Sequence, residues 1–341
     1  MTKLYWKIKN SAQTPFLRLL GNKGLLPNKK DDRDHIADFG FSLKPYQPKH
    51  NEADYFRYQF LQTDNICTAA GAALALSEQM GVRWSTKALM RMMVKQKMVN
   101  GNGFSYQRAP LEVIVKHGLI PYYLMPDENP RGQWKDYSKW DDETERLYAE
   151  VASKYRMSEY QKLGNEAAIF EAVDNGFVVI TASDWYGAMN RPRSPGYFLE
   201  FAGGKIGGHQ YRASGYRKQG ADFITPQTFG EWYGDNGKSY SRTLFGKGYF
   251  DNWIVNFEGK PNLPIAVILP LFIKENEGLL VKAHDHLNDP RCYILENGKK
   301  RHVSGDDNMK TFQHLFKKIG LTRVNKSLLD SIPLGEPYPL I

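Results

Sequence analysis

Apolar residues in the first half of the chain recur at helical spacing, and glycine- or asparagine-containing turns separate the apolar segments. The predicted helices cover 67–80, 85–97, 110–117 and about 165–175. The first is rich in Ala and Leu, and we expect Asp64 or Asn65 to cap its N-terminus. The stretch 127–160 is instead charged and aromatic, which is typical of a surface excursion.

The pattern changes from helical to extended after residue 176. Phe177–Ala182 is rich in apolar and β-branched residues and predicts a buried strand. Residues that favour strands then cluster between glycines at 197–201, 209–216, 222–225 and 249–256. Helices first and strands afterwards predict an α+β domain, with its functional site between the two halves.

Both ends of the chain differ from this central region. Residues 1–50 are irregular and punctuated by glycine and proline, so we expect an arm laid over a domain. Near the C-terminus, strands at 279–283 and 292–303 and a helix at about 308–319 predict a small β-hairpin and helix module, with Asn297-Gly298 as the hairpin turn. The predicted units are an N-terminal arm (1–50), a main domain (51–262) and a C-terminal module (275–341).

Composition and charge narrow the class of protein. The formal net charge of +9 favours an anionic partner, such as a nucleic acid, an acidic cell-wall polymer or an anionic lipid. The basic residues are spread in pairs without a nucleic-acid-binding motif, so we expect no specific nucleic-acid partner. The apolar run Leu263–Ile273 is about half the length of a membrane span, and we expect no such span. The N-terminus lacks a signal peptide, which predicts a cytoplasmic location on synthesis without secretion by that route.

Two residues carry candidate chemistry. Cys67, one of only two cysteines, opens the first predicted helix, where unpaired N–H groups and the helix dipole favour a thiolate. His209 follows two glycines at the start of a predicted strand. An imidazole near a cysteine thiol makes the thiol a stronger nucleophile. Taken alone, each residue also fits a structural role: Cys67 as an inert buried cysteine, and His209 as a histidine that serves only the packing of the fold.

Other chemistries are weaker. The metal-capable residues His284, His286, Cys292 and His302 match no zinc spacing. The stretch 234–239 resembles a phosphate loop, but Trp232 stands where that loop requires glycine. We therefore expect no metal and no cofactor.

The order of these features from about 55 to 257 resembles that of the papain-like cysteine peptidases. The resemblance is carried by several short pieces in the right order, none of them specific alone. They are Gln62, then Cys67-Thr-Ala-Ala, Asn102-Gly103-Phe104, Phe177–Ala182, Gly208-His209-Gln210 with Gly215-Tyr216, Gln227-Thr228-Phe229-Gly230, and Lys247-Gly248-Tyr249-Phe250.

The resemblance implies a two-lobed fold with a peptide or protein substrate between a helical and a β half. It makes Cys67 the nucleophile and His209 the base and then the acid, with Gln62 and the Cys67 N–H holding the oxyanion. It also implies that Asn102, Gly103, Phe104 and Gly208 line the substrate cleft.

Two departures affect the predicted site. Gln227 stands where the family orients its histidine with an asparagine; a glutamine offers the same amide oxygen on a longer arm, and Asp222 is a second candidate for that role. Gln62 lies one residue closer to the cysteine than in the family.

Three interpretations remain open. The first is a thiol hydrolase that cleaves peptide or isopeptide bonds, and the second is a peptidoglycan endopeptidase or amidase with the same Cys and His. The third is a catalytically weak or inactive structural or docking protein of a phage particle. The C-terminal module weakly resembles units appended to bacterial and phage surface proteins, which predicts a cell-wall or virion assembly partner and incorporation into a virion.

Overall fold

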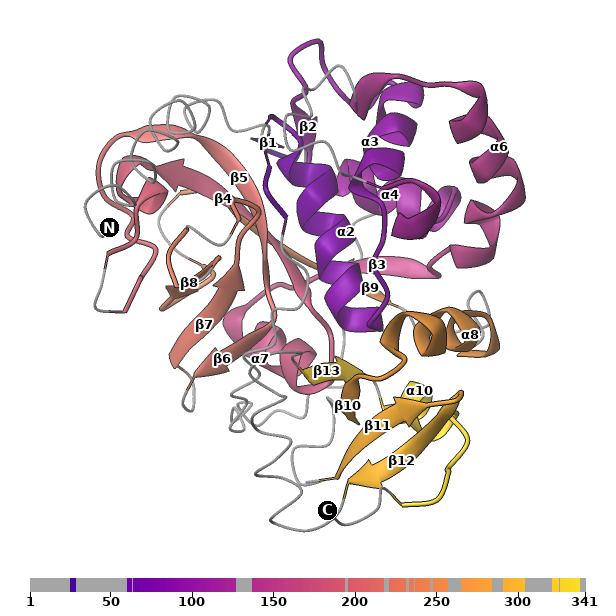
Figure 1. Ribbon diagram of the computed structural model, residues 1–341. Helices are drawn as coiled ribbons and strands as arrows, with labels where there is room; N and C mark the ends of the chain where they lie inside the picture. Colours follow the sequence, from indigo (N-terminus) through magenta and orange to yellow (C-terminus); the bar gives the residue numbers. More distant parts are fainter. Residues whose placement is uncertain are drawn as a thin grey trace, which may run out of the picture.

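The computed structural model describes residues 25–28, 60–62, 64–126, 137–193, 196–217, 221–230, 233–235, 237–245, 248–256, 265–283, 291–303, 321–324 and 326–337. A helical half and a β half lie side by side, and a smaller sheet adjoins them (Figure 1). This α+β arrangement is the predicted fold class. Most of the N-terminal arm and the helix predicted at about 308–319 lie outside the described residues.

The central helix α2 (Cys67–Met80) is buried all round except at Glu78, because its small and apolar residues occupy every face. Gly81, in the left-handed conformation with φ 65°, ends it. The predicted cap is wrong: the N-cap residue is Ile66, and no side chain caps the helix. The helical half is completed by α3 (Thr86–Lys95), α4 (Arg108–Lys116), α6 (Asp142–Glu150) and the short helices η1 (Tyr122–Leu124) and η2 (Ala152–Tyr155).

The stretch predicted as a surface excursion, 127–160, is mostly exposed or half-buried in its described part, but its regular elements were not predicted. It contains α6, η2 and strand β3 (Glu159–Lys162), which extends the main sheet. Leu147 and Met157 are buried there, spaced singly among charged residues. Single apolar positions of this kind give little sequence signal, although they suffice to anchor a helix.

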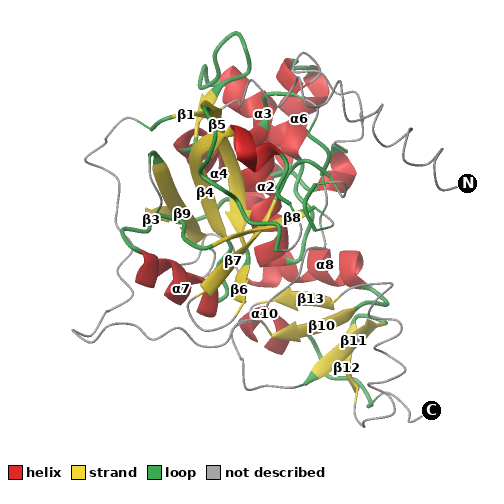
Figure 2. Ribbon diagram, turned by 90° about the vertical axis from the view of Figure 1, so that its left-hand side faces the viewer, coloured by secondary structure: helices red, strands yellow, loops and turns green. Residues whose placement is uncertain are grey.

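The main sheet has the strand order β3-β9-β4-β5, and every pair is antiparallel. The predicted strands are confirmed as β4 (Val179–Tyr186), β5 (Lys205–Ala213) and β9 (Phe250–Asn256), and α7 (Glu166–Asp174) lies beside the sheet (Figure 2). Ala182 in β4 pairs with Gln210 in β5 and with Asp251 in β9. This register fixes which side chains face α2.

A second sheet joins β6 (Gly215–Arg217), β7 (Ala221–Pro226) and β8 (Lys238–Ser241) in that order. The strand predicted at 197–201 is wrong, since only Phe198 forms an isolated bridge there. Polar β8 was missed because its sequence, KSYS, carries no apolar run. The short helix η3 (Gly187–Asn190) follows β4.

The C-terminal part begins with α8 (Ile265–Asn276) and ends with α10 (Lys326–Asp330). Its sheet has the order β12-β11-β10-β13, formed by Lys299–Val303, Cys292–Glu296, Leu280–Ala283 and Leu321–Val324. The predicted hairpin turn is confirmed: Asn297 and Gly298 have φ of 52° and 73°, as a two-residue turn with left-handed residues requires.

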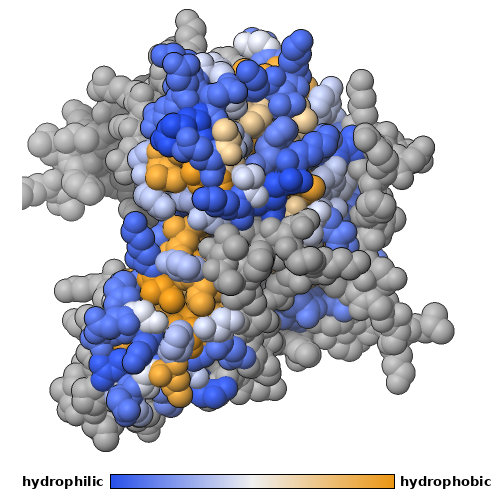
Figure 3. Space-filling view, turned by 90° about the vertical axis from the view of Figure 1, so that its right-hand side faces the viewer, coloured by the Kyte–Doolittle hydropathy of each residue, from blue (hydrophilic) through white to orange (hydrophobic). Residues whose placement is uncertain are grey.

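The C-terminal part packs directly on the helical half. Asn276 Nδ2 donates to the carbonyl of Gly81 at the end of α2, at 2.8 Å. Leu295 and Leu328 belong to the same buried cluster as α2 and α3. Apolar residues also gather in a patch on the left of the face in Figure 3, near the level of α8 in Figure 1. The domain boundaries and the docking role of this part stay predictions.

Among the described residues, no helix combines the length and apolar character that a bilayer crossing needs. In the same part of the chain, no three or more His, Cys, Asp or Glu side chains are grouped to hold a metal ion. His284 and His286 lie outside the described residues.

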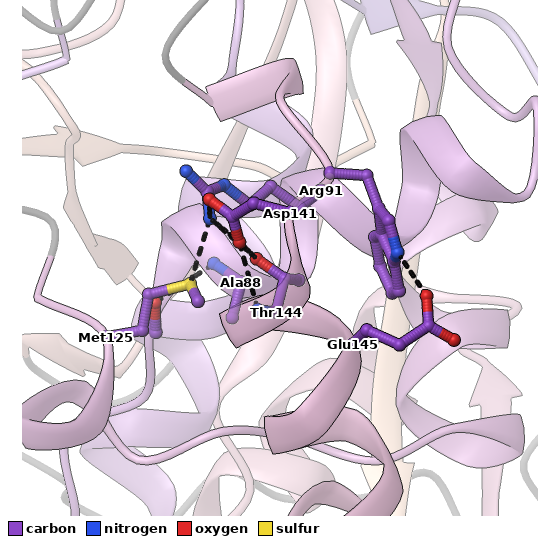
Figure 4. A network of polar contacts seen from close by, with 8 residues as sticks. Ala88, Arg91, Met125, Asp141, Thr144 and Glu145 are labelled. Atoms are coloured by element: carbon purple, nitrogen blue, oxygen red, sulfur yellow. Dashed lines mark hydrogen bonds and ion pairs between the residues drawn. The ribbon is translucent and has the colours of Figure 1, made fainter.

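A polar network joins α3 to α6 (Figure 4). Arg91 Nη1 contacts both carboxylate oxygens of Asp141, at 2.9 and 3.0 Å, and the hydroxyl of Thr144 at 2.6 Å. The backbone N–H of Thr144 also donates to Asp141, the N-cap of α6. Burial alone would raise the pKa of Asp141, but the hydrogen bonds from Thr144 and the charge of Arg91 outweigh it, so this pKa lies below its ordinary value.

This network predicts a dependence of stability on pH. Because the folded state favours the Asp141 carboxylate, its contribution is complete above the unfolded pKa of about 3.9 and is lost as the pH falls through the lower folded pKa. Asp141→Asn should lower the unfolding free energy by about 1 kcal/mol at pH 7 and flatten the acid side of the profile. Thermal unfolding of both chains between about pH 7 and pH 2 measures this; parallel profiles would contradict it.

Candidate active site

Cys67 is the first residue of α2 and is fully buried. Its apolar surroundings are Ala182 of β4 and Leu25 of strand β1 (Leu25–Leu26), with Tyr249 packed beside them. The thiol therefore lies where the helical half meets the β half, and a residue of the N-terminal arm, Leu25, belongs to the same buried apolar cluster.

Helix α2 packs tightly on β5. The amide nitrogen of Gln210 donates to the carbonyl of Thr68 at 2.7 Å. A Cβ on Gly71 would lie 2.9 Å from Gln210 Cγ, so only glycine allows this approach. Because Thr68 follows Cys67 and Gln210 follows His209, the two predicted catalytic residues are brought to the same end of the helix–strand contact.

His209 lies on β5 beside this contact. The imidazole is fully buried among aromatic rings of the β half. There it stacks on Phe229, with ring centroids 4.6 Å apart and planes 16° apart, and meets Trp185 edge-on at 4.7 Å. Aromatic rings thus hold the imidazole in one orientation and exclude water from it.

The segment that leads into Cys67 is tied to the segment that carries Phe229. The N–H of Gln62 donates to the carbonyl of Thr228 at 2.6 Å, and the Thr228 hydroxyl donates to Gln62 Oε1 at 2.7 Å. Gln62 Nε2 donates to the carbonyl of Asp64 at 2.6 Å. These bonds hold Gln62 beside the turn into α2 and leave one amide hydrogen of its NH₂ group for a further acceptor.

Gln227 directly precedes Thr228 and is fully buried. Its amide nitrogen donates to the Thr225 carbonyl and the Ser239 hydroxyl, each at 3.1 Å. Within the part of the chain that the structure describes, its Oε1 accepts no hydrogen bond. Asp222, the other candidate for orienting His209, lies at the opposite end of β7 from Gln227.

The predicted cleft wall is the turn that contains Asn102, Gly103 and Phe104. Its shape is fixed by Asn100, whose side-chain oxygen accepts from the N–H groups of Asn102 and Phe104 at 3.0 Å each. Asn65, two residues before Cys67, donates its side-chain amide to the Asn102 carbonyl at 3.0 Å. The turn therefore flanks the entry into α2.

Gly208 faces the arm. Strand β1 pairs in parallel with β2 (Ser105–Tyr106), and Figure 1 shows both near the start of α2. A Cβ on Gly208 would lie 3.1 Å from the carbonyl oxygen of Leu25. The glycine thus allows the arm to pass close to β5.

All eight predicted site residues consequently lie around the N-terminus of α2, and the roles assigned to them stay predictions. Sequence reasoning missed four residues near them: Leu25, Asn28, Tyr249 and Asp251. Tyr249 stands in a quoted motif, but Leu25 and Asn28 belong to an arm without periodicity, and nothing in the sequence signals their contact with the main domain.

Comparison with known proteins agrees with this fold. No protein-family model and no curated protein sequence matches the chain. Among solved structures, the chain is similar to xylellain, a cysteine protease from Xylella fastidiosa, with a TM-score of 0.55 and 17% identity over 70% of this chain and 96% of that one. It is also similar to procathepsin B S9 from Trypanosoma congolense, with a TM-score of 0.53 and 13% identity over 71% and 88% of the two chains. The chain therefore has a papain-like fold.

Proposed function

We propose that the chain is a thiol hydrolase that cleaves peptide or isopeptide bonds, with Cys67 as its nucleophile. The observation that carries this proposal is the Thr68–Gln210 hydrogen bond, which joins the residue after Cys67 to the residue after His209. A cysteine at the first turn of a buried helix also meets unpaired N–H groups and the positive end of the helix dipole.

In this proposal His209 takes the thiol proton, and the thiolate attacks the substrate carbonyl carbon. The oxyanion accepts hydrogen bonds from the Cys67 N–H and from Gln62, whose Nε2 lies beside the same turn. The leaving amine then takes the proton from His209, and water hydrolyses the resulting thioester. Substrate lies along the Asn102–Phe104 turn and Gly208.

Gln227 is proposed to orient His209. Its buried Oε1, which has no donor among the described residues, is an acceptor of the kind that an imidazole N–H needs. A buried amide oxygen left without a donor costs about 1–3 kcal/mol, which a hydrogen bond from His209 would recover.

Selective alkylation tests the activation of Cys67. A free thiol is only a few per cent ionised at about pH 7, whereas a histidine-paired one is almost wholly ionised. Limiting iodoacetamide at about pH 6 should therefore label Cys67 on the order of tenfold faster than Cys292, and His209→Ala should abolish the preference. Mass spectrometry of the two cysteine peptides follows both rates.

Two features of the structure sharpen this test. Cys292 is also buried, at 6% exposed, so it controls for burial as well as for reagent. Leu25 lies in the same buried cluster as Cys67, so the comparison is repeated in a Leu25→Gly chain, and His302→Ala serves as a histidine control outside the site. Equal labelling of the two thiols in the Leu25→Gly chain would show that Cys67 is a packing residue.

A further inference from the structure

The arm continues from Leu25 to Asn28 over the face of the main sheet on which Cys67 lies. Ala182, which contacts Cys67, is paired with Asp251 across β4 and β9. Paired residues of neighbouring strands present their side chains on the same face. Asp251 therefore lies one strand away from the residue that contacts the thiol.

The side chain of Asn28 is bound at both ends of its carboxamide. Its Nδ2 donates to Asp251 Oδ2 at 2.7 Å, and its Oδ1 accepts from the backbone N–H of Arg108, the first residue of α4, at 3.2 Å. The backbone N–H of Asn28 donates to the Tyr249 hydroxyl at 3.1 Å. The site thus offers an acceptor and a donor, spaced to fit one carboxamide.

The groups that hold Asn28 have fixed roles as donor or acceptor. Asp251 is 2% exposed, its Oδ2 accepts from Asn28, and its other oxygen lies 2.9 Å from Lys162 Nζ, so both oxygens face donors. Burial, and after it the charge of Asp251, raise the pKa of Tyr249. The hydroxyl therefore stays protonated and donates to Asp251 Oδ2 at 3.1 Å.

We propose that the Arg108 N–H, Tyr249 and Asp251 form a carboxamide-selective subsite of the cleft, which binds an asparagine side chain of a polypeptide and which Asn28 fills in this structure. The inference deepens the proposed function, since it assigns a side-chain preference to the cleft beside Cys67. The preference comes from the Arg108 N–H, Tyr249 and Asp251, which belong to the main domain, and not from the arm.

The chemistry of the subsite predicts which side chains it rejects. An aspartate would place a second carboxylate against Asp251 and has no donor for it. A leucine would remove the hydrogen bonds that the carboxamide makes to the Arg108 N–H and to Asp251 Oδ2, and a site built for hydrogen bonds discriminates strongly against such analogues. Glutamine carries the same carboxamide one methylene further out.

The test uses the full chain and the accessibility of Cys67, so it does not depend on hydrolysis. Asn28→Asp should raise the rate of Cys67 alkylation several-fold, because it drives the arm away from Asp251. Asn175→Asp is the matched control, since Asn175 is an exposed residue at the end of α7 and undergoes the same change of charge. Asn28→Leu removes the carboxamide without adding charge, and thermal unfolding checks that each variant is folded.

Peptides then probe the emptied subsite of the Asn28→Asp chain. The probe is Gly-Leu-Leu-Pro-Asn-Lys, the sequence of residues 24–29, together with versions that carry Asp or Leu in place of Asn. The Asn peptide should protect Cys67 from alkylation at about a tenfold lower concentration than either other peptide. When Asp251→Asn is added, the Asn peptide should protect Cys67 less selectively against the Asp peptide, or the Asp peptide should protect it better. The side-chain amide of the new asparagine can donate a hydrogen bond to the carboxylate of the Asp peptide.

Equal protection by the three peptides, or unchanged alkylation in both Asn28 variants, would overturn the subsite. A chain that cleaves no peptide but is protected selectively by the Asn peptide would refute the hydrolase and retain the subsite. The two proposals can therefore fail separately.

Discussion

Replacing Cys67 with alanine should reduce hydrolysis of a broad peptide pool by a factor on the order of 10⁴ or more, because no other group can form the acyl intermediate. The substitution removes one sulfur from a site that is already apolar and fully buried, so the fold should be retained. Cleavage is measured by mass spectrometry of the peptide products.

The comparison is made in a Leu25→Gly background, since Leu25 and Cys67 belong to one buried cluster and the smaller residue should open it. Cys292→Ala is the matched control: it removes the other buried thiol, which lies in β11, and should leave the rate unchanged. Full cleavage by the Cys67→Ala chain would refute the thiol mechanism and leave this site as a scaffold.

Removing the carboxylate of Glu78 should destabilise the chain by about 3–5 kcal/mol, because it leaves Arg212 charged and buried without its partner. The two side chains, 5% and 0% exposed, join α2 to β5 through an ion pair of 2.6 Å. Burial raises the pKa of Glu78, although the charge and hydrogen bond of Arg212 oppose this. Chemical denaturation of Glu78→Ala measures the loss.

The exposed pair Arg146–Glu150 supplies the control. Its side chains are 55% and 58% exposed at 2.9 Å, so Glu150→Ala should change stability by less than about 1 kcal/mol. Since Glu78 and Arg212 lie on the elements that carry Cys67 and His209, Glu78→Ala should also reduce the selective alkylation of Cys67. Equal effects of the two substitutions would mean that the α2–β5 contact does not depend on this pair.

The local elements of the main domain could be predicted from the sequence because their signals are short-range. A continuous run of small and apolar residues at 67–76 predicts a buried helix, and Asn297-Gly298 predicts a tight hairpin turn. The α6–β3 region could not be predicted in this way, because its buried residues are isolated among charges and acquire meaning only when α3 and β9 pack against them.

The candidate site also has features that follow from local sequence and features that depend on tertiary contacts. The sequence by itself determined the residue types that carry chemistry, Cys67 and His209, since a helix start and a glycine-flanked strand are local patterns. The tertiary structure alone brought them to one end of the α2–β5 contact, because the close approach at Gly71 depends on Gln210, more than a hundred residues away. It alone also placed Leu25 in the cluster of Cys67 and Asn28 on Asp251, since contacts between an aperiodic arm and a distant strand leave no pattern in either segment.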